Sequence, residues 1–261
     1  MNEVSVNSVS EYVKYVENLP QAELWFRGVA NIEYKPIPGL IWKEYTSIEG
    51  SMEHDFLVGY QSYVTQNKLN EWETYALMQH HGLPTRLLDW SESALVALFF
   101  ALTSEPNSTS ERVVWCMNPY ALNQQTFGKE TIYCPAVMNH KYVDMHDDLI
   151  SLDAYLPPNL RPDGVGIMPP APLAICTTQH IRRVSTQKGC FTVHGSSPNS
   201  IDTYLKDDEL FTQIKINIES NEQREAMVYS LARMGIDEEF IYQDLDSLCS
   251  KINRHAKRWM G

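Results

Sequence analysis

The apolar run Ala94–Leu102 constrains the fold of this chain more than any other segment. It is apolar at nearly every position, so a helix formed from it has no polar side to turn toward water. The run is also far shorter than the roughly 20 residues that a membrane-spanning helix needs. The sequence therefore predicts a helix that is buried in a protein core, with other elements packed around it.

The start of this helix is predicted from a capping pattern. Asp89 is a favourable N-cap residue, and Glu92 follows it at the spacing of a capping box. We therefore expect the buried helix to run from Asp89 to Leu102. Other helices are expected over Ser8–Val16, Gly50–Gln66 and Glu71–His80, and two more are expected to begin after Ser220 and at Asp244.

Segments typical of strands lie apart from the paired helices instead of alternating strictly with them. β-Branched or alternating apolar residues predict strands at Glu23–Gly28, Val113–Met117, Cys190–His194 and Phe211–Glu219. This order favours an α+β fold with a central mixed or antiparallel sheet flanked by helices. Hydrophobic residues make up 43% of the chain, which is enough to bury such a core.

The chain of 261 residues is expected to form a single domain. We expect a core over about residues 20–195, followed by a strand and a helical pair over about residues 211–259. The segment Tyr155–Pro172 holds six prolines, so it is expected to be irregular and to wrap the surface or form a lid.

The net charge and the composition of the first ten residues argue against several classes of function. The net charge of −12 argues against a uniformly basic face for gripping nucleic acid. The start Met1–Ser10 has neither the basic beginning nor the apolar stretch of a signal peptide, so we expect a cytoplasmic protein without a membrane partner. The five cysteines are widely spaced and never form Cys-x-x-Cys, which predicts buried free thiols.

The sequence shows no strong metal or nucleophile signature. His140 and His146 lie among aspartates, but a solvated loop is the favoured interpretation, and no metal is expected. Ser196 and Ser197 follow Gly195, and we interpret them as a turn rather than as nucleophiles.

One segment concentrates polar and charged side chains between two apolar helices. It runs from Gln79 to Trp90 and contains two histidines, an arginine and an aspartate. Polar groups in such a place must either pair with other groups of the protein or bind a ligand. One interpretation is structural, with Arg86 paired to Asp89 while Asp89 caps the helix. The other is a pocket wall that offers imidazole, guanidinium and indole to a ligand. In both cases we expect Arg86 to contact Asp89 directly.

Two further features lie at strand ends. Arg27 stands between Phe26 and Gly28 at the end of an apolar strand, where a charge is costly unless it meets an anion. It is either a structural ion-pair residue, with Asp89 as a candidate partner, or a cation that binds a ligand. The segment Thr186–Phe191 is either an ordinary strand entry or part of the same site.

These three features closely resemble the motifs of the FRG domain family, which is named for its Phe/Tyr-Arg-Gly motif. The matching stretches are LWFRG, QHHGLPTRLLDW with the following SALVALFFAL, and QKGCF. The central motif is long and irregular, and the resemblance covers about residues 20–195. A later YQDLDSL stretch is similar to an FPDLDGL-like motif of the family, with Tyr-Gln in place of Phe-Pro.

The order of the motifs is also similar to that of ADP-ribosyltransferases. Those proteins begin with an Arg or His on a first core strand. A polar or aromatic motif before a helix follows, and then a Glu or Gln region on a later strand. Arg27, the segment Thr85–Ser93 and Gln187 fall in this order. The similarity implies an ADP-ribosyltransferase-like core and NAD⁺ as co-substrate.

Chemistry and resemblance together assign roles within these motifs. A guanidinium suits the diphosphate of NAD⁺, an aromatic face suits nicotinamide, and a carboxylate suits the cation formed when the glycosidic bond breaks. The catalytic candidates are Arg27, His81, Asp89 and Gln187, and the candidates for binding NAD⁺ are Arg27, His80, Arg86, Trp90 and Phe191. An obvious catalytic glutamate is missing, because Glu238 and Glu239 are interpreted as a solvated turn.

The resulting expectation is an NAD⁺-dependent ADP-ribosyl transfer enzyme that acts as a toxin or a phage-defence effector. Its acceptor would be a protein, an RNA or a DNA, and an antitoxin protein is a candidate partner. The alternative is a non-catalytic module that binds a nucleotide or a partner in the same pocket. A hydrolase of unknown type is a third interpretation.

Overall fold

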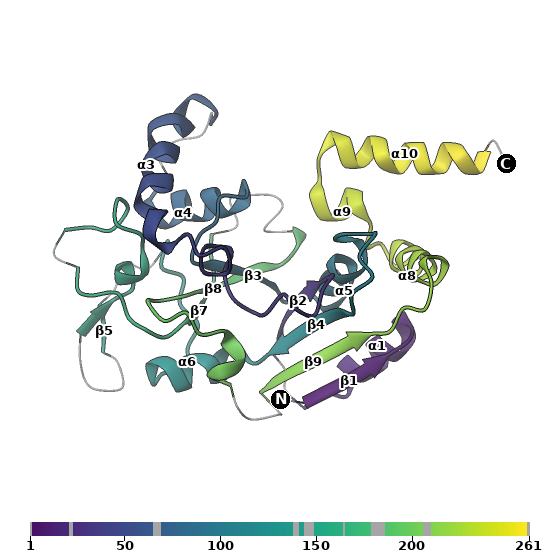
Figure 1. The fold of residues 1–261 in the computed structure, drawn as a ribbon, viewed down its shortest axis with the longest axis horizontal. Coiled ribbons are helices and arrows are strands. Elements are labelled where there is room, and N and C mark those ends of the chain that lie inside the picture. Colours follow the sequence, from purple (N-terminus) through teal and green to yellow (C-terminus); the bar gives the residue numbers. More distant parts are fainter. Residues whose placement is uncertain are drawn as a thin grey trace.

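A seven-stranded sheet forms the centre of the protein in the computed structural model (Figure 1). The structure describes residues 2–20, 23–64, 69–137, 141–143, 149–163, 165–178, 186–205 and 210–259. In spatial order the strands are β1 (Asn2–Val6), β9 (Phe211–Ile216), β4 (Arg112–Met117), β2 (Trp25–Val29), β3 (Leu87–Ser91), β8 (Gly189–Val193) and β7 (Leu173–Ile175). β1 and β9 are parallel and the other neighbours are antiparallel, so the predicted α+β fold with a mixed sheet is confirmed.

Helices lie around this sheet, and two short strands, β5 (Lys141–Val143) and β6 (Leu149–Ser151), pair apart from it. The helices are α1 (Val9–Glu17), α2 (Gly39–Trp42), α3 (Glu49–Gly59), α4 (Glu71–His80), α5 (Ala94–Thr103), α6 (Pro119–Phe127), α8 (Asn221–Arg233), α9 (Glu238–Tyr242) and α10 (Leu245–Trp259). In Figure 1, α10 extends away from the body of the protein. No helix in the described part of the chain combines the length and the apolar character needed to cross a bilayer.

Several predicted helices form where their capping residues stand. The hydroxyls of Ser8 and Ser220 accept N–H groups in the first turns of α1 and α8. α3 ends earlier than the predicted Gln66, because only part of its apolar stripe packs onto the core and Tyr63 is exposed. The interpretation of Glu238 and Glu239 as a solvated turn is wrong, because Asp237 caps the short helix α9 there.

The apolar helix α5 packs directly on β2, and Gly28 makes this contact possible. A Cβ at Gly28 would lie 1.8 Å from the main-chain oxygen of Ala97, so a larger residue cannot stand there while the strand and helix stay in place. Val96, Leu98 and the other buried residues of α5 join the same apolar cluster. The predicted burial of the run is therefore confirmed, and the glycine of the LWFRG stretch has a packing role.

The predicted start of this helix at Asp89 is wrong. Residues Leu87–Ser91 form β3, which pairs with β8 over five residues, and α5 begins only at Ala94. The cap is Ser93, whose hydroxyl accepts the N–H of Val96. Pairing with β8 overrides the capping pattern of Asp89 and Glu92, and Leu88 and Trp90 are buried on one side of β3.

Replacing Ser93 by alanine should therefore destabilise the protein by about 0.5–2 kcal/mol, the usual cost of losing a hydroxyl N-cap. Asp89→Ala should lack this cost, because Asp89 lies within a strand and its carboxylate is more than half exposed, at 56%. Urea unfolding of the two purified variants checks the difference. A larger loss for Asp89→Ala than for Ser93→Ala would contradict the observed helix start.

Candidate functional site

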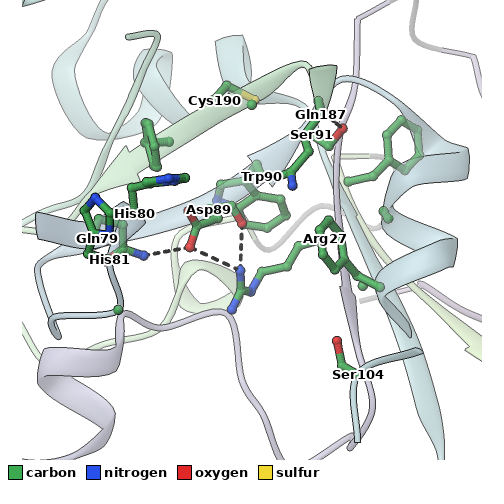
Figure 2. Close-up of a pocket in the computed structure, with 17 residues that line it drawn as sticks. Arg27, Gln79, His80, His81, Asp89, Trp90, Ser91, Ser104, Gln187 and Cys190 are labelled. Atoms are coloured by element: carbon green, nitrogen blue, oxygen red, sulfur yellow. Dashed lines mark hydrogen bonds and ion pairs between the residues drawn. The ribbon is translucent and has the colours of Figure 1, made fainter. Parts of the chain in front are cut away.

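A cleft of about 680 Å³ opens where β2 and β3 separate (Figure 2). The two strands share a single register pair, Phe26 with Ser91, whereas β2 pairs with β4 along its whole length. The walls come from β2, β3, β8, the end of α4 and the inner face of α5. This volume is in the range of pockets that hold small molecules and cofactors.

Most of the predicted site residues meet in this cleft. The lining includes Arg27, His80, His81, Asp89, Trp90, Gln187 and Phe191. Arg86 does not line it. Residues that the sequence analysis did not single out also take part, among them Gln79, Ser91, Phe100 and Ser104. The only sequence signal for Gln79 is its place beside the histidine pair, and nothing in the sequence marks Ser104.

Arg27 supplies the cation of the cleft. Its Nη1 donates to the main-chain oxygen of Asp89 at 2.8 Å and lies 4.0 Å from the Asp89 Oδ2. Its Nε is buried and has no hydrogen-bond partner among the described residues. Burial lowers the pKa of Arg27 and the nearby Asp89 carboxylate raises it, but a guanidinium keeps its proton in proteins. Arg27 therefore carries a permanent positive charge, and part of its guanidinium is not hydrogen-bonded to the described residues.

Asp89 supplies the anion, and its orientation is set by a chain of hydrogen bonds. Gln79 Nε2 donates to Asp89 Oδ2 at 2.6 Å, and Gln79 Oε1 accepts the hydroxyl of Thr85 at 2.6 Å. The Thr85 hydroxyl in turn accepts the N–H of Leu87 at the start of β3. Figure 2 shows the amide of Gln79 and the guanidinium of Arg27 both directed at Asp89. The carboxylate is thus held in place yet open to the cleft.

The aromatic and histidine residues differ in how accessible they are. The Trp90 indole is buried, and its Nε1 donates to the Thr192 hydroxyl at 3.1 Å. Phe191 is also buried. His81 is exposed, and its ring meets the edge of the His80 ring with centroids 4.9 Å apart. Of the predicted aromatic and imidazole groups, His81 is the one most open to solvent at the cleft.

Gln187 connects the cleft to the C-terminal helices. Its main-chain oxygen accepts the Ser91 hydroxyl at 2.6 Å, and its side-chain Nε2 donates to the main-chain oxygen of Ile241 in α9 at 3.1 Å. The side-chain amide of Gln187 is therefore already hydrogen-bonded to α9. This link could not be predicted from the sequence, because more than fifty residues separate the two partners along the chain.

The predicted contact between Arg86 and Asp89 is wrong. Arg86 is buried, and its Nε and Nη2 form a forked pair with the carboxylate of Glu49, with Nη2 2.6 Å from Oε2. Its Nη1 donates to the main-chain oxygen of Gly195 at 2.7 Å. Because the chain from Leu87 onward is extended, residues three apart point to opposite faces of the sheet. Arg86 thus fastens α3 to the sheet outside the cleft.

The surroundings of Arg86 are buried and polar. The hydroxyl of Tyr75 accepts the N–H of Arg86 at 2.7 Å. Burial, with a smaller contribution from the Arg86 charge, lowers the pKa of His194 to about 3. His194 is therefore neutral at ordinary pH. Arg86, Glu49, Tyr75 and His194 form a buried polar cluster that links α3 and α4 to the sheet next to the cleft.

Other candidates from the sequence lie away from the cleft. The predicted turn at Ser196 and Ser197 is wrong, because their N–H groups donate to the main-chain oxygens of Pro169 and Pro170 in a distant segment instead of closing a local turn. No described residue of Tyr155–Pro172 lines the cleft, so the described part of this segment is not a lid over it. Glu239 bonds to Lys251 at 2.5 Å, outside the cleft. His140 and His146 fall outside the described residues.

Residues 22–110 match the family model of the FRG domain. The match contains the LWFRG and QHHGLPTRLLDW stretches and helix α5, and it ends before QKGCF. It therefore includes Arg27, Gln79, His80, His81 and Asp89, and the resemblance is confirmed over this range. No curated protein and no solved structure is significantly similar to the chain.

Proposed function

We propose that the cleft of this FRG domain binds NAD⁺ and transfers its ADP-ribose to a macromolecular acceptor. One observation carries the proposal, namely the oriented Arg27 and Asp89 at the point where β2 and β3 separate. A fixed cation and an exposed carboxylate, side by side in one cleft, match the two charge demands of this reaction. These demands are a dianionic diphosphate in the substrate and a cationic sugar in the transition state.

Binding relies on Arg27. Nη1 of its guanidinium is bonded to Asp89 and Nε is buried, so Nη2 is the nitrogen that offers its donors to phosphate oxygens. The bond to the Asp89 main chain fixes the guanidinium before any ligand arrives, which reduces the entropy cost of binding. The dinucleotide would then extend from Arg27 toward the histidine pair at the end of α4.

Catalysis relies on Asp89. When the bond between C1′ of the ribose and the nicotinamide nitrogen breaks, its electron pair leaves with nicotinamide, which becomes neutral. The positive charge that develops on the ribose is stabilised by the Asp89 carboxylate, which Gln79 orients. The acceptor nucleophile then bonds to C1′ and gives its proton to His81, which is exposed at the cleft.

This activity suits a toxin or a phage-defence effector, since modification of a protein or a nucleic acid by ADP-ribose can disable it. An antitoxin would then act by covering the exposed cleft near His81 and Asp89.

A second function is a nucleotide-binding module without catalysis. Its specific support is that none of the described residues lining the cleft is a glutamate and that the carboxylate of Asp89 is already bonded to Gln79. A carboxylate shared in this way stabilises a developing cation less than an unshared one does. Such a module would bind the dinucleotide through Arg27 and leave it intact.

The test is incubation of the purified protein with cell extract and NAD⁺ labelled in the adenylate phosphate. We expect label in macromolecules, and digestion with protease or with nuclease identifies the acceptor class. Asp89→Asn should bind NAD⁺ but transfer little label, whereas Glu92→Gln, which removes an exposed neighbouring carboxylate outside the cleft, should behave as wild type. NAD⁺ binding without any transfer or nicotinamide release would favour the binding module.

A further inference from the structure

Two cysteines lie side by side at the outer edge of the sheet. A parallel bridge joins Tyr133 to Ile175, so the residues that follow, Cys134 and Cys176, come next to each other. The N–H of Cys176 donates to the main-chain oxygen of Tyr133 at 2.8 Å, and the Cys176 sulfur lies 3.5 Å from the same oxygen. The Cys134 and Cys176 thiols are close enough to shift each other's pKa, in opposite directions.

The expectation of five buried free thiols is corrected by these positions. Cys116 and Cys190 are buried, but Cys134 and Cys176 are partly exposed, and Cys249 is exposed. Small oxidants in solution can therefore reach the Cys134–Cys176 pair, whereas Cys116 and Cys190 are shielded.

The pair is also chemically asymmetric. The hydrogen bond with Cys176 lowers the pKa of the Cys134 thiol to about 7, and the backbone N–H groups of Val137 and Ala136 assist. The same hydrogen bond, together with burial, raises the pKa of Cys176. With this lowered pKa, a part of the Cys134 population is thiolate at neutral pH, next to the neutral thiol of Cys176. This is the arrangement in which one sulfur is oxidised and the other resolves the product.

We propose that Cys134 and Cys176 are a redox modification site that forms a reversible disulfide when the protein meets a peroxide. The Cys134 thiolate attacks one oxygen of hydrogen peroxide, the O–O bond breaks, and the leaving hydroxide takes a proton to become water. The Cys176 sulfur then attacks the resulting sulfenic acid of Cys134. The S–S bond forms, and the second oxygen leaves as water with the Cys176 proton. Two thiols and one peroxide give one disulfide and two waters.

The position of the pair connects it to the cleft. Cys176 directly follows β7, in which Ile175 is paired with Phe191 of β8, a residue of the cleft wall. The disulfide would fasten the loop after α6 to this edge of the sheet. A small thiol would reverse it by exchange. The site stands independently of the proposed NAD⁺ chemistry, because it needs only the two thiols and the oxidant.

The test treats the full-length protein with about one equivalent of hydrogen peroxide, blocks the remaining thiols, digests the protein and identifies linked peptides by mass spectrometry. We expect a peptide pair joined through Cys134 and Cys176, which dithiothreitol separates. Cys249→Ser is the matched control and should give the same product. Cys176→Ser should leave a sulfenic acid on Cys134 that dimedone traps, and Cys134→Ser should leave Cys176 reduced.

A second test uses the wild-type protein and therefore does not depend on the folding of any variant. The rate at which iodoacetamide labels Cys134 should rise with pH through a midpoint near 7, because only the thiolate reacts. A peroxide product linked through other cysteines, or none while Cys249 oxidises, would overturn the proposal. So would labelling of Cys134 with the midpoint of an ordinary thiol, near 8.5.

Discussion

Replacing Arg27 by alanine should abolish the transfer of labelled ADP-ribose and weaken NAD⁺ binding by about 100-fold or more. Two charge-assisted hydrogen bonds to phosphate, at about 1.5–3 kcal/mol each, account for this factor. The fold should survive, because the carboxylate beside Arg27 is 56% exposed and is not left as a buried, unpaired charge. We expect a stability loss of about 1 kcal/mol or less.

Two further variants separate charge from geometry at this position. Arg27→Lys keeps the positive charge but loses the planar fork, so it should bind NAD⁺ more weakly than wild type and more tightly than Arg27→Ala. Arg233→Ala removes an exposed arginine outside the cleft and should leave binding unchanged. Thermal melting of each variant checks the fold. Unfolding of Arg27→Ala at room temperature would show that Arg27 is a structural ion-pair residue.

Replacing Arg86 by alanine should destabilise the protein by about 3–5 kcal/mol, the range for breaking a buried ion pair. The change leaves the buried carboxylate of Glu49 without its forked partner and the oxygen of Gly195 without its donor. Both partners are about nine-tenths buried, so water cannot replace the lost bonds easily. Urea unfolding measures the loss.

The double variant Arg86→Met with Glu49→Leu distinguishes the loss of the ion pair from the cost of leaving one buried charge unpaired. Removing both charges together should cost less than Arg86→Ala alone, because no charge is left buried without a partner. A loss below about 1 kcal/mol for Arg86→Ala would contradict the buried pair. If Arg86→Ala folded normally but failed to bind NAD⁺, Arg86 would belong to the binding site after all.

The parts of the fold that follow from local sequence could be predicted. α4 begins and ends at the predicted residues, Glu71 and His80, and Gly82 takes a left-handed conformation just after it, as expected for a glycine that ends a helix. The strands near Arg27, Val113 and Cys190 could be predicted from their short apolar runs. The cleft residues Arg27, His81 and Asp89 could be selected because charged groups stand there between apolar elements.

The predictions that the structure contradicts lie where residues far apart in the sequence determine the local structure. Asp89 and Glu92 satisfy a capping pattern, but pairing with β8, about a hundred residues later, places Asp89 within a strand. The partner of Arg86 is Glu49, 37 residues earlier, and no local pattern connects the two. The strand β1 is short and half polar, and it forms because β9 from the other end of the chain pairs with it. Single-sequence patterns contain no information on such contacts.

The assignment of the cleft as a dinucleotide site is tested most directly by a calorimetric titration of NAD⁺ into the purified wild-type protein, with Arg27→Ala and Arg233→Ala alongside. We expect saturable binding of about one NAD⁺ per chain in the wild type and in Arg233→Ala. We expect no measurable binding in a folded Arg27→Ala. A folded wild-type protein that does not bind NAD⁺, or equal binding by Arg27→Ala, would contradict the assignment of the cleft as a dinucleotide site.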